Sequence, residues 1–170
     1  MIKTNFVPMT EALKIAEQRG IALGAFEFWS YEVAKAIVSA AEELDVPVIL
    51  QCGKTEIDRM GGMEQTVETA YMASKDSTVP VVLHLDHATT FEYCNEAVNA
   101  GFSSVMIDAS ALPFEENVAL TRKVARRAKP FGVSVEGELG RLVGEEGDIV
   151  VKGPEAAQTD PDEALRYVQE

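Results

Sequence analysis

The sequence predicts an α/β fold in which helices cover a parallel sheet, and three observations carry that prediction. Short apolar runs alternate along the 170 residues with longer segments of helical periodicity. The apolar runs lack polar alternation, which is typical of strands buried on both faces of a parallel sheet. Each strand with its following helix takes roughly thirty residues, the length of a right-handed βαβ unit.

Five apolar runs are the predicted strands, and they lie at residues 21–28, 46–52, 79–86, 103–110 and 132–140. The segments between them are predicted to be crossover helices, at residues 31–45, 63–77, 89–101 and 113–132. In the first of these, Val33, Ile37 and Leu44 fall on one face at helical spacing, as an amphipathic helix requires. A further helix over residues 9–20 precedes the first strand.

The polar residues near the strand ends favour a (β/α)8 barrel over an open doubly wound sheet. A barrel places its site at the carboxyl ends of many strands, whereas a doubly wound sheet places ligands mainly where the strand order reverses. Polar residues lie near the carboxyl ends of four successive predicted strands: Gln51, Asp86, His87, Asp108, Glu136 and Glu138. We therefore expect a barrel.

The last residues predict one more helix. Asp160 suits the N-cap, Pro161 the first helical position and Glu163 the third. Five strands precede this helix, and a complete barrel usually needs about 250 residues. We expect residues 1–170 to be the N-terminal part of a single barrel domain, supplying its first five βα units.

Composition and charge exclude several classes of function. The chain has 15 Lys and Arg against 28 Asp and Glu, a formal net charge of −13, which disfavours nucleic acids and anionic membranes as partners. No apolar run approaches the ~20 residues of a membrane span, and the N-terminus lacks a signal-peptide core. We expect a cytoplasmic protein. Cys52 and Cys94 have neither metal nor redox spacing and are expected to be free thiols.

The segment HLDHA, residues 84–88, is the densest group of candidate functional residues. Strand alternation would place His84 and Asp86 on one side and Leu85 and His87 on the other. Imidazole can bind a divalent metal, and a neighbouring carboxylate can exchange protons with a substrate hydroxyl. Two histidines cannot complete a zinc site, so a metal would also need carboxylates or residues outside this sequence. The structural alternative is a pair of hydrogen-bonded histidines that cap a strand.

Carboxylates in three other segments are further candidates. Glu136 and Glu138 should share one strand face, where two carboxylates repel each other unless a cation lies between them or a pKa rises. Asp108 follows four apolar strand positions and is either a helix N-cap or a metal ligand. Glu146 belongs to an acidic, glycine-rich segment that is either a mobile catalytic loop or a solvated surface loop.

Several motifs together resemble the class II, zinc-dependent aldolases of fructose bisphosphate and tagatose bisphosphate. They are GAFEF, VPVILQC, VVLHLDHA, SVMIDAS, and VEGELG with GEEGD, and they span essentially the whole chain. The resemblance implies a (β/α)8 barrel that binds Zn²⁺ or another divalent cation. In this family the metal polarises the carbonyl of a phosphorylated ketose and stabilises the enediolate of the dihydroxyacetone-phosphate type left when aldol cleavage releases an aldehyde.

The resemblance also implies roles by position. His87 matches the first zinc histidine, and Glu138 and Asp108 match carboxylates that surround the metal. Asp86 matches the acid/base that exchanges a proton with the hydroxyl that becomes the aldehyde. Glu146 matches a mobile-loop glutamate that transfers a proton at the other carbon. The family further implies a homo-oligomer, either a dimer or a tetramer.

Two departures from the family bear on the substrate. Glu27 stands where the family usually has Asn, and Gly53 lies near an expected serine, so we expect a ketose phosphate other than the usual bisphosphate. Gln51 and Glu27 are the expected substrate-binding residues. The two remaining zinc histidines and the phosphate loops of the family belong to strands six to eight. The alternative is that the protein is a non-catalytic paralogue and serves as a partner subunit. The joint presence of the candidate catalytic and metal-binding residues argues for an enzyme.

Overall fold

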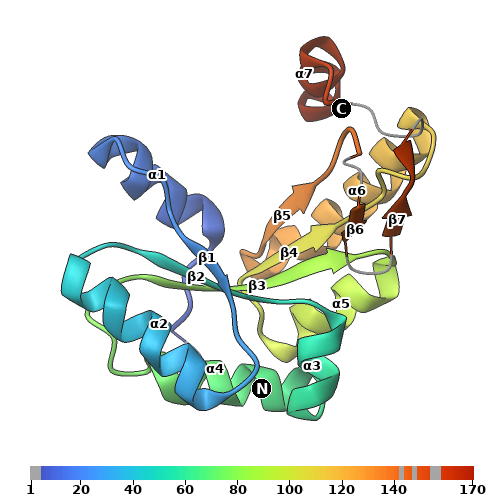
Figure 1. Ribbon diagram of the computed structural model, residues 1–170. Coiled ribbons are helices and arrows are strands. Elements are labelled where there is room, and N and C mark those ends of the chain that lie inside the picture. The colour runs from blue at the N-terminus through green and yellow to red at the C-terminus, as the bar shows by residue number, and fades with distance from the viewer. Residues whose placement is uncertain (1–4, 142–143, 147–148, 154–157) are drawn as a thin grey trace.

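Five parallel strands form one sheet in chain order (Figure 1). The computed structural model describes residues 5–141, 144–146, 149–153 and 158–170. The strands of the sheet are β1 (Ala25–Glu27), β2 (Val48–Cys52), β3 (Val81–Ala88), β4 (Ser104–Ile107) and β5 (Ser134–Gly137). A separate antiparallel pair consists of β6 (Gly144–Glu146) and β7 (Ile149–Val151). The predicted parallel α/β fold is confirmed.

Helices precede, connect and follow the strands of the sheet. They are α1 (Met9–Arg19), α2 (Tyr31–Leu44), α3 (Lys54–Met60), α4 (Met63–Ser74), α5 (Phe91–Ala100), α6 (Phe114–Ala128) and α7 (Pro161–Gln169), with a 3₁₀ turn at Lys129–Phe131. Several begin at side-chain caps: Ser30 Oγ accepts a hydrogen bond from the backbone N–H of Val33, and Asp160 accepts from Asp162 and Glu163. The predicted helix start at Asp160 is therefore confirmed.

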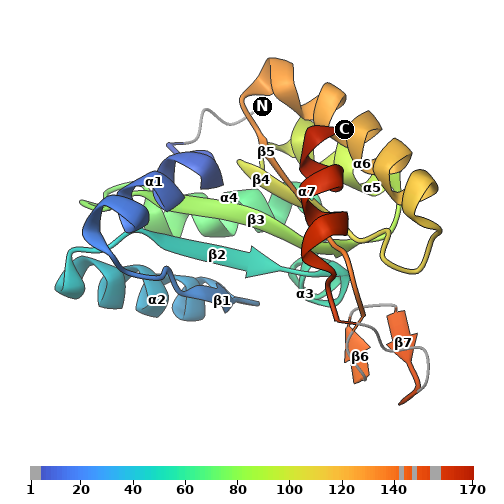
Figure 2. The ribbon, with the colours of Figure 1, turned by 90° about the horizontal axis from the view of Figure 1, so that it is seen from above.

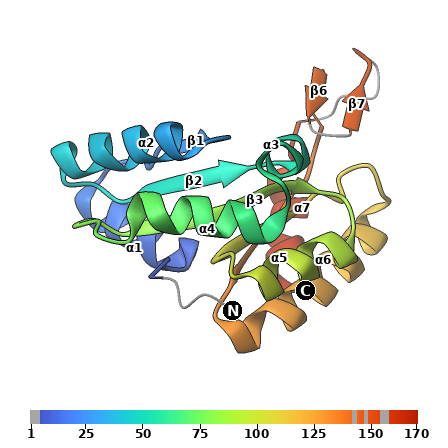
Figure 3. The same ribbon diagram turned by 90° about the horizontal axis from the view of Figure 1, so that it is seen from below.

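The crossover helices α2, α4, α5 and α6 cover one face of the sheet, as the view in Figure 3 shows. Alternate strand residues such as Leu50, Leu83 and Val105 point to this face and are fully buried against helix residues such as Val67 and Ala97. Burial of this apolar surface supplies the main driving force for the fold. Sequential strand order with crossover helices on one face differs from a doubly wound sheet, which has helices on both faces.

The opposite face divides into an apolar and a polar half. At the amino ends of the strands, Ala12 of α1 packs on Ile49 and Val82, and α1 lies across this face in Figure 2. At the carboxyl ends the same face carries ionisable residues. Helix α7 packs beside α6, where the Tyr167 hydroxyl lies 2.9 Å from Asn117 Oδ1.

The structure corrects the sequence prediction at three places. The predicted first strand, residues 21–28, is reduced to β1, whose three residues are exposed because β2 is its single strand neighbour within the described chain. Helix α3 and the hairpin β6–β7 were not predicted. Among the described residues, no helix combines the length and the apolar character needed to cross a membrane.

Candidate active site

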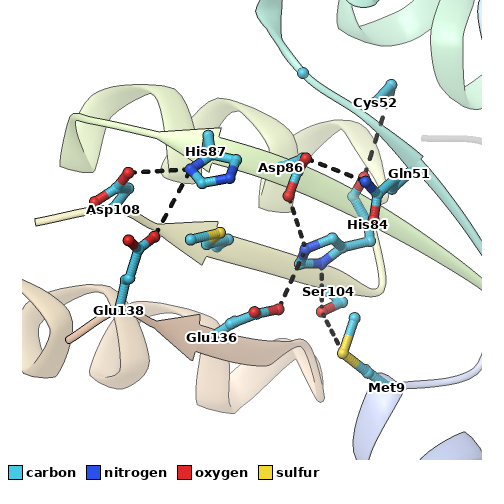
Figure 4. A network of polar contacts seen from close by, with 12 residues as sticks. Met9, Gln51, Cys52, His84, Asp86, His87, Ser104, Asp108, Glu136 and Glu138 are labelled. Atoms are coloured by element: carbon cyan, nitrogen blue, oxygen red, sulfur yellow. Dashed lines mark hydrogen bonds and ion pairs between the residues drawn. The ribbon is translucent and has the colours of Figure 1, made fainter. Parts of the chain in front are cut away.

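The carboxyl ends of β2, β3, β4 and β5 bring the candidate functional residues to one place (Figure 4). Side chains of a strand alternate between its two faces, so every second residue points away from the crossover helices. The groups assembled on this face are Gln51, His84, Asp86, His87, Ser104, Asp108, Glu136 and Glu138. The predicted clustering of polar residues at the strand ends is therefore confirmed.

A β-bulge near the end of β3 places Asp86 and His87 in the same pocket. Leu85 pairs with Val105 and Ala88 pairs with Ile107, so two residues of β3 lie opposite one residue of β4. His87 takes up the extra residue in the left-handed region, with φ of 44°. Such a bulge redirects a side chain. The prediction that Asp86 and His87 point to opposite sides was wrong, because it assumed unbroken alternation.

His87 lies between two carboxylates from neighbouring strands. Its Nδ1 lies 3.0 Å from Asp108 Oδ2 and 3.8 Å from Glu138 Oε2. Asp108 is held in turn by Ser110, whose backbone N–H and hydroxyl both donate to Oδ1, at 3.0 and 2.7 Å. Asp108 is therefore not the N-cap of α6, a position that Pro113 occupies.

The charges of this group are strongly coupled. The hydrogen bond with Asp108 raises the pKa of His87 to about 9, and the negative charges of Asp86, Asp108 and Glu138 add to this rise against the effect of burial. Burial works to raise the pKa of Asp108, but hydrogen bonds with His87 and Ser110 outweigh it and hold that pKa below its ordinary value. Without a metal, His87 is thus an imidazolium between carboxylates.

The same three residues fit a divalent cation. His87, Asp108 and Glu138 each offer one ligand atom, and these atoms lie within 4.8 Å of one another. Imidazole and carboxylate donors suit Zn²⁺ and other divalent transition metals. Asp108 is 3% exposed, so a cation would also neutralise a buried negative charge.

Asp86 borders a pocket of about 390 Å³ together with His87, Glu136 and Glu138. Its Oδ2 accepts a hydrogen bond of 3.2 Å from Gln51 Nε2. Gln51, predicted as a substrate contact, therefore lies against the predicted acid/base. A pocket of this size can hold a small polar substrate beside a carboxylate that accepts or donates a proton.

Two features of the site were not predicted from the sequence. They are the presence of Ser104 and the contacts that His84 makes. His84 is 2% exposed; its Nδ1 lies 2.9 Å from Ser104 Oγ and its Nε2 lies 3.4 Å from Glu136 Oε2. Burial, with a smaller effect of the His87 charge, lowers the pKa of His84 to about 4. Burial and the Asp86 charge raise the pKa of Glu136. Ser104 lies four positions before Asp108, so strand alternation could have predicted that the two side chains point to the same face of the sheet.

The remaining candidates lie around this centre. Glu27 is exposed at the end of β1, and its pKa is raised by partial burial and by the charges of Glu56 and Asp86. The side chain of Glu146 lies outside the part of the chain that the structure describes. Cys52 and Cys94 are buried free thiols, as predicted, and burial raises the pKa of Cys94 to about 12.

Comparison with known proteins places this arrangement in a family. The family model for fructose-bisphosphate aldolase class-II matches residues 7–170. The chain belongs to the class II fructose-bisphosphate aldolase family. The resemblance read from the motifs is therefore confirmed, and the bulged His87 and its two carboxylates belong to a class II aldolase chain.

Individual class II relatives agree with this assignment. The chain is 46% identical over 165 residues to the "Probable fructose-bisphosphate aldolase" of Bacillus subtilis, covering 96% of this chain and 57% of the relative. It is 46% identical over 160 residues to the fructose-bisphosphate aldolase of Helicobacter pylori strain J99, covering 94% and 52%. The YdjI aldolase structure from Escherichia coli K12 matches with a TM-score of 0.79 at 30% identity, covering 96% and 56%. The chain thus spans about half the length of the curated relatives it matches.

Proposed function

We propose that the full-length protein is a metal-dependent lyase that reversibly cleaves a phosphorylated ketose into a product of the dihydroxyacetone-phosphate type and an aldehyde. The observation that carries the proposal is the convergence of His87, Asp108 and Glu138 beside Asp86 in one pocket. An aldol cleavage needs a group that binds a cation and a group that transfers a proton, both beside the same substrate. Membership of the class II family supports the same reaction.

His87, Asp108 and Glu138 would hold the divalent cation, which we propose to be Zn²⁺ because imidazole is among its preferred ligands. A cation bound there would polarise the ketose carbonyl and stabilise the negative charge that develops on it. For it to bind, His87 must lose the proton that its raised pKa retains. The carboxylates of Asp108 and Glu138 then offset the charge of the cation.

Asp86 would move the proton of the cleavage step. In the cleavage direction its carboxylate accepts the proton of the hydroxyl that becomes the aldehyde, and in condensation it returns that proton. Gln51 Nε2 donates to Oδ2 of Asp86 and so fixes the orientation of the carboxylate. We assign Glu146 to proton exchange at the other carbon and Gln51 and Glu27 to the substrate-facing wall.

We also infer that residues 1–170 are the N-terminal part of a single (β/α)8 barrel domain, with five of its βα units. The sequential strand order and the one-sided crossover helices support this arrangement. We propose that the full-length protein is a cytoplasmic homo-oligomer, a dimer or tetramer, that acts on a sugar phosphate rather than on nucleic acid or membrane. The acidic composition supports that partner choice.

The experiment is a cleavage assay of the full-length protein, prepared with and without Zn²⁺, on fructose 1,6-bisphosphate, tagatose 1,6-bisphosphate and ketose 1-phosphates. We expect the zinc-loaded protein to release dihydroxyacetone phosphate together with an aldehyde, and a chelator to abolish the release. The Asp86→Asn variant is the matched control for contaminating aldolase. Zinc-loaded protein that cleaves none of these substrates, yet binds metal stoichiometrically, would support the non-catalytic alternative instead.

A further inference from the structure

His84 is a deeply buried ionisable side chain of the site, 2% exposed, and both of its ring nitrogens have polar neighbours (Figure 4). Nδ1 lies 2.9 Å from the Ser104 hydroxyl of β4. Nε2 lies 3.4 Å from Glu136 Oε2 and 3.9 Å from Asp86 Oδ1. Nothing in the reaction described above uses His84, although it occupies the space between Asp86 and Glu136.

The surroundings of His84 favour one tautomer. Because burial lowers the pKa of His84 to about 4, the ring is neutral at physiological pH and carries one N–H donor and one acceptor nitrogen. If the proton were on Nδ1, the Nε2 lone pair would face the carboxylates of Asp86 and Glu136. With the proton on Nε2, the N–H points toward those carboxylates, and the Ser104 hydroxyl donates to Nδ1 at 2.9 Å in preference to Met9 Sδ at 3.9 Å, because a thioether sulfur is a weak acceptor. The second arrangement satisfies both nitrogens and avoids electrostatic repulsion.

We propose that Ser104 and His84 act as a positioning pair that holds the carboxylate of Asp86 in its proton-transfer orientation. This inference rests on the proposed aldol cleavage. Ser104 favours the Nε2–H tautomer, and that N–H faces the carboxylates of Glu136 and Asp86, at 3.4 and 3.9 Å. Gln51 donates to Oδ2 of Asp86 from β2, and the His84 ring faces Oδ1 at 3.9 Å, so the two oxygens have polar neighbours in different directions.

Glu136 makes this pair necessary. Asp86 Oδ1 and Glu136 Oε2 lie 3.9 and 3.4 Å from the same ring nitrogen, so two like charges lie close together beside Nε2 and repel each other. A donor between them relieves that repulsion, and a lone pair in the same place would increase it. Loss of the tautomer should therefore turn Asp86 away from the substrate without touching the metal ligands.

Ser103 offers a matched control for Ser104. Both serines are buried on β4 or at its start, but the Ser103 hydroxyl bonds to the backbone of Leu83 and not to His84. Removing either hydroxyl costs one buried hydrogen-bonding group. Ser104→Ala, and not Ser103→Ala, should change the state of His84.

The first measurement compares two partial reactions of the zinc-loaded full-length protein. We expect Ser104→Ala to lower kcat for ketose cleavage about tenfold or more, because a small misplacement of a reacting group has effects of this order. Metal content, KM and proton exchange into the dihydroxyacetone-phosphate half should stay near wild type. Ser103→Ala should keep normal cleavage, and Asp86→Asn/Ser104→Ala should be no slower than Asp86→Asn. Equal losses in the two serine variants, or additive losses in the double variant, would overturn the proposal.

The second measurement reads the tautomer directly and does not depend on activity. In ¹⁵N-histidine NMR of the same zinc-loaded protein, we expect His84 to be neutral with the proton on Nε2, and Ser104→Ala to produce a mixture of tautomers. A proton on Nδ1 in the wild type contradicts the positioning pair even if the protein is an active aldolase. The expected tautomer together with no cleavage of any ketose phosphate would instead refute the proposed function and, with it, the role of the pair.

Discussion

The two histidines of β3 lie three positions apart, yet their environments shift their basicity in opposite directions. His84 sits in the middle of the strand, 2% exposed, and burial lowers its pKa to about 4. His87 sits in the bulge, where carboxylates raise its pKa to about 9. The difference indicates that position relative to the strand end shapes each ring: the buried ring suits the supporting role proposed for it, and the ring at the strand end suits the proposed metal-binding role.

Replacing each histidine in turn is the strongest way to break this comparison. His87→Ala should remove a metal ligand, abolish stoichiometric zinc uptake and lower kcat by about 10³-fold or more, since metal catalysis supplies several kcal/mol. His84→Asn, the matched variant, should keep the zinc. Metal analysis after dialysis against Zn²⁺ gives the answer. Full occupancy in His87→Ala would disprove the assignment of His87.

The neighbour of His87 should behave differently from His87 itself. Asp86→Asn keeps the shape of the side chain but removes the proton acceptor, so we expect a loss of about 10²-fold or more in kcat with normal zinc content. Parallel metal analysis and cleavage assays on one preparation separate the two roles. A variant that loses metal along with activity would make Asp86 a ligand.

Most of the fold followed from local patterns. The helices over residues 31–45, 63–77 and 113–132 were predicted because their apolar faces have helical spacing, and the structure has α2, α4 and α6 in these segments. The short strand β1 was overestimated because its apolar residues read as a buried strand. The exposure of β1 depends on how many strands lie beside it. The sequence of residues 21–28 alone does not determine the number of neighbouring strands.

The site could be predicted in composition but not in geometry. Their position near the carboxyl ends of successive strands correctly brought Asp108 and Glu138 to the edge where His87 lies. Strand alternation failed for His87, because one inserted residue reverses the direction of the next side chain. The contact of His84 with Ser104 joins residues twenty positions apart, and it depends on the register of β3 with β4. No local sequence pattern determines that register.

The pH dependence of stability sharpens the contrast in the metal-free protein. His84 has a folded pKa below its unfolded value near 6.5, so stability is lost as pH falls from 6.5 toward 4. His87 has a folded pKa above 6.5, so its contribution is present below pH 6.5 and is lost as pH rises through 9. Each histidine accounts for up to about 3 kcal/mol of the free energy of unfolding.

Urea unfolding of the full-length protein with a chelator, between pH 4.5 and 9.5, measures these two limbs. The difference between wild type and His84→Gln should depend on pH only on the acid side, and the difference between wild type and His87→Gln only on the alkaline side. Differences from the wild type cancel the titration of the many other carboxylates. A pH-independent difference for both variants would mean that the two environments are alike.

The smallest expected effect concerns Glu27, which lies at the exposed end of β1 outside the cluster of the two histidines. Its charge would repel a nearby substrate phosphate by ~4 kcal/mol at close range with an effective dielectric of ~20, and solvent exposure reduces this to about 1 kcal/mol. We therefore expect the protein to prefer a ketose 1-phosphate over fructose 1,6-bisphosphate. Glu27→Asn should raise the ratio of kcat/KM for bisphosphate over monophosphate by about tenfold or less.

The matched control is Glu11→Gln, which removes one negative charge from α1, the helix that packs near the amino ends of the strands. Both variants change the net charge equally, so a general effect of protein charge on phosphate binding would appear in both. A local repulsion would appear only in Glu27→Asn, and it should shrink as ionic strength rises. The same substrate ratio in wild type, Glu27→Asn and Glu11→Gln would show that Glu27 faces solvent during catalysis and leaves specificity to residues nearer His87.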